Sequence, residues 1–200
     1  MLGVTLDPVL TFNQHVTDVV HACTYHTCAL RHIRPILTVA AAKSIATSIV
    51  GAKLDYCNSL LYGTSECNSD RLQRVLNQLA RVGLQAPWTA SATDLRCQLH
   101  WLPIRQRIAF KLTAVAYKTR QSGIPEYLHC DIRDYQPCRT LRSTSALLLQ
   151  QPPATIALAS RAFCAAAPTV WNSLDVHIRS ADTFSTFKDR LKLNCLNPAV

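Results

Sequence analysis

The spacing of apolar residues constrains this sequence most, because apolar side chains recur every three or four positions through long stretches of it. Residues 12–33 give the first example, and their apolar side chains fall on one face of a helix. Thr11 or Asn13 is the expected cap of that helix. The apolar positions are Phe12, Val16, Val19, Cys23 and Leu30.

Two more helices are predicted before Pro87. One runs from Thr38 to Gly63, a usual stop residue, and bends near Gly51. The next begins at a cap among residues 68–70 and ends before Pro87, which disfavours helix in the residue preceding it. Short links join the three helices, so we expect a compact antiparallel three-helix bundle.

The third of these helices is amphipathic and has a basic outer face. Its apolar side is formed by Leu72, Val75, Leu76 and Leu79. Its opposite side is formed by Arg71, Arg74, Gln78 and Arg81. This arrangement predicts a helix that packs on the bundle and presents cations to solvent.

A fourth helix is predicted over 103–121, where Pro103 occupies the first-turn position that proline favours. Apolar residues form two stripes on it, and Arg107, Lys111 and Lys118 lie between them, with Arg105 nearby. Two interpretations stay open. The cations either extend their charged ends to solvent past apolar neighbours, or face a groove shared with a ligand.

Two segments of the chain are predicted to contain strand. Residues 2–7 resemble a short strand closed by Asp7 and Pro8, and 131–160 suggest a loop with one or two strands. A final helix is capped by Thr183 or Ser185. We therefore expect a mainly α chain: a strand at 1–10, a helical bundle at 11–87, and a smaller α+β tail at 88–200, which includes a short helix after residue 87.

The charge of the chain is concentrated in one region. The 200 residues carry 21 Lys and Arg against 12 Asp and Glu, a net charge of +9. Residues 71–120 contain nine of the basic residues and one acid, Asp94. A local excess of this kind favours a polyanionic partner, nucleic acid ahead of a membrane surface, although a merely basic protein is the alternative.

No self-sufficient active site is predicted. Residues 21–28 contain two His and two Cys, but at helical spacing these side chains point in different directions and cannot converge on zinc. No glycine-rich phosphate loop, nucleophile turn or cluster of acids occurs. We therefore expect no catalytic residue, no metal ligand and no cofactor in this chain.

The composition also bears on location. The nine cysteines have no paired short spacing, which favours reduced thiols. The first residues lack the pattern of a signal peptide, and the longest apolar-leaning stretch contains lysines and serines. We expect an intracellular protein, cytoplasmic or nuclear, with no membrane partner and an oligomeric state that the sequence leaves open.

Several sequence blocks, in their order, resemble the C-terminal part of LINE-class (non-LTR) retrotransposon reverse transcriptases, which are RNA-directed DNA polymerases. The likeness runs over nearly the entire chain. The blocks are LGVTLD, HTCALRHIRPIL, AKLDYCNSLLYG, LQRVLNQLAR, LHWLPIRQRIAFKL, IPEYL, RTLRS, RAFCAAAPTVWNSL and TFSTFKDRLK.

The resemblance implies a role. Residues 2–7 would match the last strand of the catalytic palm, and the three helices would match the thumb, which lies along the template–primer duplex. A thumb holds an RNA–DNA or DNA duplex through its phosphates, without regard to sequence. The implied phosphate contacts are Arg71, Arg74, Arg81, Arg105, Arg107, Lys111 and Lys118.

The same resemblance implies that catalysis is absent. Polymerisation needs palm aspartates that hold two Mg²⁺ ions, and no adjacent Asp pair occurs in this sequence. Two stretches also depart from the family by having fewer basic residues, at 84–94 and 147–160. The alternative from another class is a helical protein-interaction module, in which the apolar stripes of 104–117 receive a partner.

Overall fold

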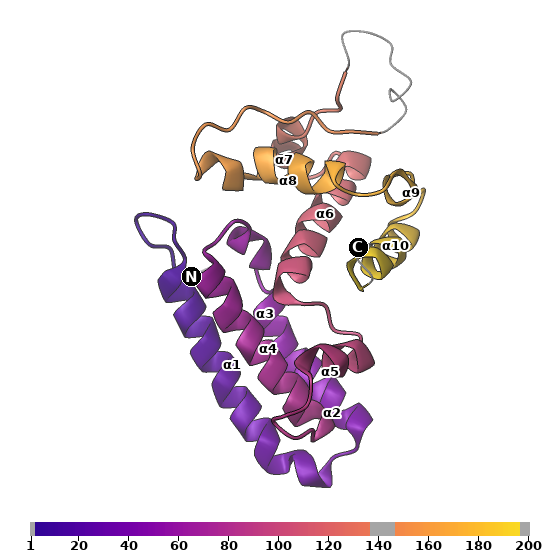
Figure 1. Ribbon diagram of the computed structural model, residues 1–200. Coiled ribbons are helices and arrows are strands. Elements are labelled where there is room, and N and C mark those ends of the chain that lie inside the picture. The colour runs from indigo at the N-terminus through magenta and orange to yellow at the C-terminus, as the bar shows by residue number, and fades with distance from the viewer. Residues whose placement is uncertain (1–2, 137–146, 197–200) are drawn as a thin grey trace. The chain divides into compact units, whose positions relative to one another are not determined.

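The computed structural model describes residues 3–136 and 147–196, and this part of the chain is mainly helical, as predicted (Figure 1). It divides into two compact units, residues 1–108 and 109–200. The first unit contains α1 (Asn13–Ile33), α2 (Val39–Ile45), α3 (Ala52–Asp55), α4 (Glu66–Leu84), α5 (Ala92–Leu99) and the start of α6 (Ile104–Ser122). The second contains the rest of α6, α7 (Glu126–Asp131), α8 (Phe163–Asn172), α9 (Val176–Arg179) and α10 (Phe184–Leu196).

Helices α1 and α4 lie side by side and run in the same direction (Figure 1). Two hydrogen bonds fix this arrangement. At the starts of the helices, Asn68 Nδ2 donates to Asn13 Oδ1 at 2.8 Å. At their ends, Arg34 Nε donates to the carbonyl of Gly83 at 2.9 Å. The chain between them returns through α2 and α3, so these segments of the first unit are arranged up-down-up.

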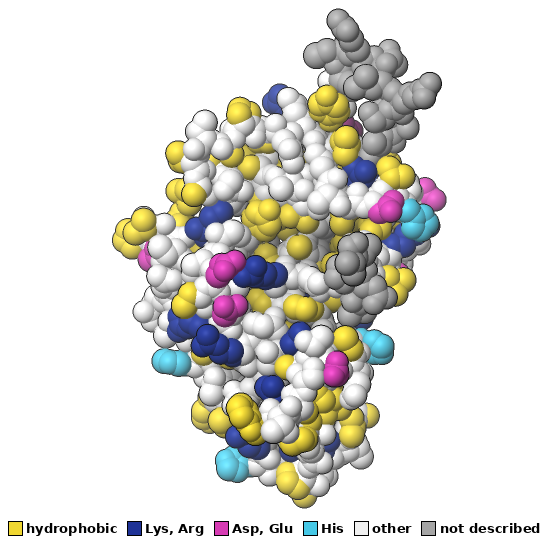
Figure 2. All heavy atoms as spheres, viewed as in Figure 1, with side chains coloured by type: hydrophobic (Ala, Val, Ile, Leu, Met, Phe, Trp, Pro, Cys, Tyr) yellow, Lys and Arg dark blue, Asp and Glu magenta, His cyan; other side chains and the backbone are white. Residues whose placement is uncertain are grey.

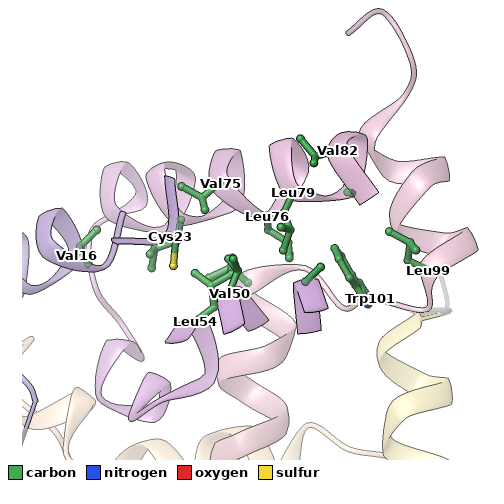
Figure 3. Packing of buried hydrophobic residues seen from close by; sticks show 14 of the residues in the cluster. Val16, Cys23, Val50, Leu54, Val75, Leu76, Leu79, Val82, Leu99 and Trp101 are labelled. Atoms are coloured by element: carbon green, nitrogen blue, oxygen red, sulfur yellow. The ribbon is translucent and has the colours of Figure 1, made fainter. Parts of the chain in front are cut away.

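The core of the first unit is assembled from all three layers of this bundle. Figure 3 shows Cys23 of α1, Val50 and Leu54 of the returning segment, and Leu76 and Leu79 of α4 pointing into one interior. Burial in this core raises the pKa of the Cys23 thiol to about 11, so the thiol behaves as a small apolar side chain. The apolar face predicted for 12–33 is confirmed at the buried positions Phe12, Val16, Cys23 and Leu30.

The predicted strand near the N-terminus is wrong: the described residues 3–10 form no strand. A strand needs a partner with which to pair, and the described part of the first unit offers none. The Asp7 carboxylate instead accepts hydrogen bonds from the backbone N–H of Thr11 at 2.8 Å and of Phe12 at 2.7 Å. These bonds, led by that from Thr11, lower the pKa of Asp7. Asp7 thus fixes the two residues that precede α1, and the predicted cap Thr11 accepts through its hydroxyl from the N–H of Asn13 at 3.4 Å.

The start of α4 also differs from the prediction. Its cap is Ser65, whose hydroxyl accepts from the N–H of Asn68 at 3.3 Å, so the helix begins before the predicted residues 68–70. Asn68 is buried, and its side-chain amide bonds to Asn13 and to the carbonyl of Thr11. Asn68 was a predicted cap, whereas in the structure it joins two helices.

Residues 38–63 do not form one continuous helix. The α-helical pattern of α2 widens to π-type hydrogen bonding over Ala46–Gly51, returns in the short α3, and is followed by a 3-10 turn at Asn58–Leu61. Thr38 caps α2 by accepting from the N–H of Ala41. The position of the bend predicted near Gly51 falls in this π-type segment, and the α-helix ends at Asp55 and not at Gly63.

After α4 the chain turns at 85–90 and runs back along that helix. Arg96 of α5 bonds to the Asn77 side chain, and Gln73 Oε1 accepts from the N–H of Ile104 at 2.9 Å. Burial lowers the pKa of the Arg96 guanidinium. Because this segment packs on α4, the first unit extends to residue 108, beyond the boundary at 87 placed from the sequence.

The second unit is organised around an aromatic cluster. The rings of Tyr117 and Phe187 stack with centroids 4.2 Å apart, and Trp171 lies 5.8 Å from Phe187. Trp171 and Phe187 are fully buried. The hydroxyl of Tyr117 donates to the carbonyl of Ala181 at 2.8 Å. The predicted cap Thr183 is confirmed, since its hydroxyl accepts from the N–H of Thr186 at the start of α10.

The β-structure predicted for the tail is nearly absent. Within the described residues, the tail contains one isolated antiparallel bridge, between Asp134 and Leu149. The side chain of Asn172 takes the remaining hydrogen bonds of Leu149, accepting from its N–H at 2.9 Å and donating to its carbonyl at 2.8 Å. A side chain thus occupies the place of a neighbouring strand. Residues 137–146 of the predicted loop lie outside the described part.

Candidate nucleic-acid interface

The seven predicted phosphate contacts fall in both compact units. Arg71, Arg74 and Arg81 lie on α4, and Arg105 and Arg107 lie at the start of α6, all within residues 1–108. Lys111 and Lys118 lie further along α6, in the second unit. Figure 2 shows that Lys and Arg side chains on the face in view are dispersed and that several adjoin Asp or Glu. The surroundings of each cation therefore decide whether it is free to meet a phosphate.

The arginines of α4 have no carboxylate partner among the described residues. Arg74 is exposed. Arg71 is half-buried and donates to the Thr17 hydroxyl of α1 at 2.9 Å. Arg81 is half-buried and donates through Nη2 to the carbonyl of Ala90 at 3.3 Å. The apolar side of α4 is buried as predicted, at Leu72, Val75, Leu76 and Leu79. Within the described residues, no ion pair involves the three arginines of this face of α4, although the exposed Asp70 lies one turn before Arg74.

The arginines of α6 are committed to carboxylates. Arg107 is 14% exposed, and its Nη1 lies 2.9 Å from both carboxylate oxygens of Asp55 while its Nε donates to the carbonyl of Leu102. Arg105 pairs with Glu66 at 3.2 Å, with the two side chains 61% and 85% exposed. An exposed pair of this kind is weak and opens readily. Arg107 is thus held by Asp55 and by the carbonyl of Leu102 within the first unit.

The two predicted lysines differ in the same way. Lys111 is exposed, and no partner is found for it among the described side chains. Lys118 places its Nζ 4.5 Å from the centroid of the Phe184 ring, and Lys188 approaches the same ring at 5.0 Å. A cation over an aromatic face is stabilised by the ring. The Lys118 ammonium group therefore already has a stabilising contact, with the Phe184 ring, within the second unit.

A basic hollow that sequence reasoning missed lies where α1 and α4 end. It encloses about 570 Å³ and contains three arginines, two glutamines and a tryptophan. No Asp or Glu of the described chain lines it. We call it the basic hollow; its polar and aromatic residues are Arg31, Arg34, Gln78, Arg81, Gln85 and Trp88. The block ALRHIRP contains two of the arginines just before Pro35, a signal that could have drawn attention to this end of the bundle.

Arg34 and Arg81 are held in the basic hollow by the main chain. Arg34 is buried and donates to the carbonyls of Gly83 at 2.9 Å and Leu37 at 2.7 Å. Arg81 has a buried Nε for which no hydrogen-bond partner is found among the described residues. Trp88 is 84% exposed. The hollow therefore offers fixed positive charge beside an accessible aromatic ring.

The described residues show no candidate metal site, disulfide or membrane-spanning helix. They bring no three His, Cys, Asp or Glu side chains together in a metal-binding arrangement. The described cysteines form no disulfide with one another. None of the described helices combines the length and the apolar character needed to cross a bilayer.

Known proteins give no further guide to this site. Comparison of the chain with models of protein families, with curated proteins and with solved structures finds no match in any of the three.

Proposed function

We propose that this chain is the C-terminal part of a LINE-class non-LTR reverse transcriptase, from the end of the palm onward, and that its first unit binds the phosphate backbone of a template–primer duplex without regard to sequence. The ordered sequence blocks support the family. The observation that carries the binding role is the face of α4, where Arg71, Arg74 and Arg81 have no carboxylate partner among the described residues.

The geometry of α4 suits a phosphate backbone. At about 1.5 Å per residue, the helix separates Arg71 from Arg81 by about 15 Å, and about 100° per residue places its three arginines within an arc of about 80°. The opposite side of α4 is buried, so the helix is a rigid support. Arg31, exposed near the end of the neighbouring α1, extends the positive charge toward the basic hollow.

The proposed role is binding and not catalysis. The parent family polymerises DNA with palm aspartates and Mg²⁺, and the sequence blocks of this chain match only the end of the palm and the segments C-terminal to it. We assign no metal and no catalytic step to the described residues. The first unit supplies sequence-independent attraction, in which each neutralised phosphate releases a counterion.

The alternative of a protein-interaction module receives less support. It required the apolar stripes of 104–117 to be free for a partner. Ile104 and Ile108 belong to the buried core of the first unit, and Tyr117 belongs to the aromatic cluster of the second. These positions are already occupied within the chain.

Salt dependence tests the proposal. The full chain is titrated into a labelled RNA–DNA hybrid of mixed sequence at several salt concentrations. Four arginine contacts, from Arg31, Arg71, Arg74 and Arg81, predict a loss of roughly a hundredfold in affinity between 50 and 200 mM salt, since each contact contributes about 0.9 to the log–log slope. An affinity that stays flat over this range would contradict the proposal.

A matched pair of variants locates the interface. Arg74→Glu reverses one charge on the free face of α4, and we expect it to weaken hybrid binding about tenfold and to reduce the salt slope by about 1 or more. Arg133→Glu makes the same change at an exposed arginine of the second unit and serves as the control. Equal losses in both variants would show that net charge alone drives binding and would overturn the assignment to α4.

A further inference from the structure

Trp88 is the one tryptophan of the chain that remains in solvent. It is 84% exposed, whereas Trp101 and Trp171 are 6% and 1% exposed. It lies in the turn between α4 and α5 and lines the basic hollow. An exposed aromatic ring beside arginines is typical of surfaces on which nucleic-acid bases stack.

Trp88 lies beside a hollow, two of whose arginine side chains are held in place by the main chain. The open hollow has a volume of about 570 Å³, within the range of small-ligand sites. Arg34 forms part of its wall and is fixed by two main-chain carbonyls. Arg81 has one nitrogen bonded to the carbonyl of Ala90 and a second, Nε, buried without a partner among the described residues.

We propose that the basic hollow binds one unpaired nucleotide of a nucleic-acid strand, with its base against the Trp88 indole and its phosphate beside Arg31 and Arg81. Gln78 and Gln85 add side-chain amides that can donate to and accept from the edge of any base. The inference rests on the proposed function and deepens it, because it adds a single-strand subsite to a surface that otherwise binds a duplex.

A lone anion or a duplex would fit this site less well. An inorganic anion makes no use of an exposed indole, and the bases of a duplex are stacked on one another and unavailable to Trp88. An unpaired nucleotide uses the ring, the cations and the amides together. Stacking on an aromatic side chain tolerates every base, so the subsite would share the lack of sequence preference proposed for α4.

Tryptophan fluorescence tests the proposal in the full chain. Because the other two tryptophans are buried, quenching by a bound strand reports mainly on Trp88. The probes are a short oligothymidylate, a short oligouridylate and a blunt-ended duplex. We expect quenching by the single strands and little by the duplex. Quenching by either single strand supports the subsite, and the two strands together show whether it accepts DNA, RNA or both.

Two variants separate stacking from charge. Trp88→Leu should abolish the quenching and weaken single-strand binding roughly tenfold while leaving duplex binding nearly unchanged. Arg31→Gln should reduce the salt slope of single-strand binding by about 0.7. Tyr25→Leu removes an exposed aromatic ring of α1 that does not line the hollow, and it should have neither effect. Circular dichroism checks that all three variants remain folded.

The outcomes distinguish this inference from the proposed function. If hybrid binding depends on salt as expected but Trp88→Leu binds the single strands as tightly as the unaltered chain does, the subsite is wrong and the duplex role stands. If neither duplex nor single strand binds, the proposed function fails, and the subsite fails with it. Equal quenching by the duplex and by single strands would also overturn the subsite.

Discussion

Helices α4 and α6 are each 19 residues long and rich in cations, yet they use those cations differently. The arginines of α4 meet hydroxyls, carbonyls and solvent. Those at the start of α6 meet carboxylates: Arg105 pairs with Glu66 and Arg107 with Asp55. Later on α6, Arg120 lies 2.9 Å from Asp134 and Lys118 lies over an aromatic ring.

The difference arises from how much of each helix is apolar. One face of α4 is buried, so cations on its other side point away from the core without further support. Helix α6 has apolar positions on two flanks, and its cations reach past them to the surface. There, the Arg107 guanidinium acquires partners that satisfy its donors. Counting basic residues would treat the two helices alike, whereas their partners differ: the arginines of α6 are held by carboxylates, and those of α4, for which we propose the binding role, are not.

The strongest test of this division is Arg107→Ala. The substitution removes the charge-assisted bonds to Asp55 and leaves the carbonyl of Leu102 without its donor, so we expect the free energy of unfolding to fall by about 2 kcal/mol. Urea denaturation measures it. The matched change Arg74→Ala should alter stability by less than about 0.5 kcal/mol. Equal losses would erase the distinction between the helices.

The next test concerns the junction of the two helices. Gln73 of α4 accepts from the N–H of Ile104 at the start of α6. Replacing it, as Gln73→Leu, removes that acceptor, and we expect a loss of about 1 kcal/mol, the usual cost of losing a helix cap. Gln78→Leu makes the same change on the outer side of α4 and should be nearly neutral in denaturant titrations. A neutral Gln73→Leu would mean that α6 starts equally well without α4.

A smaller effect is expected from Lys118→Met. Methionine keeps an apolar side chain of similar length but removes the charge over the Phe184 ring, so stability should fall by about 0.5 kcal/mol. Lys192→Met, at an exposed position of α10, is the control in the same urea titration. If the two variants are equally stable, Lys118 is free, and it returns to the set of possible phosphate contacts.

The smallest effect is expected from Glu66→Gln. This change releases Arg105 from an exposed ion pair, and stability should change by less than about 0.5 kcal/mol. Hybrid affinity should rise slightly, because an acid near the start of α4 is lost. Glu126→Gln, in the second unit, provides the comparison. A drop in hybrid affinity for Glu66→Gln would indicate that the pair with Arg105 shapes the interface.

Periodicity predicted the mainly helical character and the buried helix faces, because burial of one helical face is a property that local sequence records. It placed α1, the apolar side of α4 and the helix opened by Pro103 close to where they lie. It failed where a structure depends on distant partners. The strand at 2–7 needed a neighbour that the described part of the unit does not offer, and Asn68 joins α1 instead of capping α4.

The candidate site was less accessible to prediction. Spacing alone puts Arg74 and Arg107 on the outside of their helices, and only the fold shows that Asp55, far away in the sequence, meets one of them. The basic hollow was harder still to predict from the sequence, because Arg31, Arg81 and Trp88 come from three different segments. Local sequence records the direction of a side chain, but not the partner that it meets there.

The anchoring of Arg34 has a consequence for how the chain tolerates change. Its two hydrogen bonds end on main-chain carbonyls, which every amino acid supplies. Substitutions at 37 and 83 that keep the backbone path would therefore leave its acceptors in place. The position of Arg34 in the wall of the hollow therefore tolerates many substitutions of its neighbours. As the sequence diverges, we expect this geometry to be among the last features to be lost.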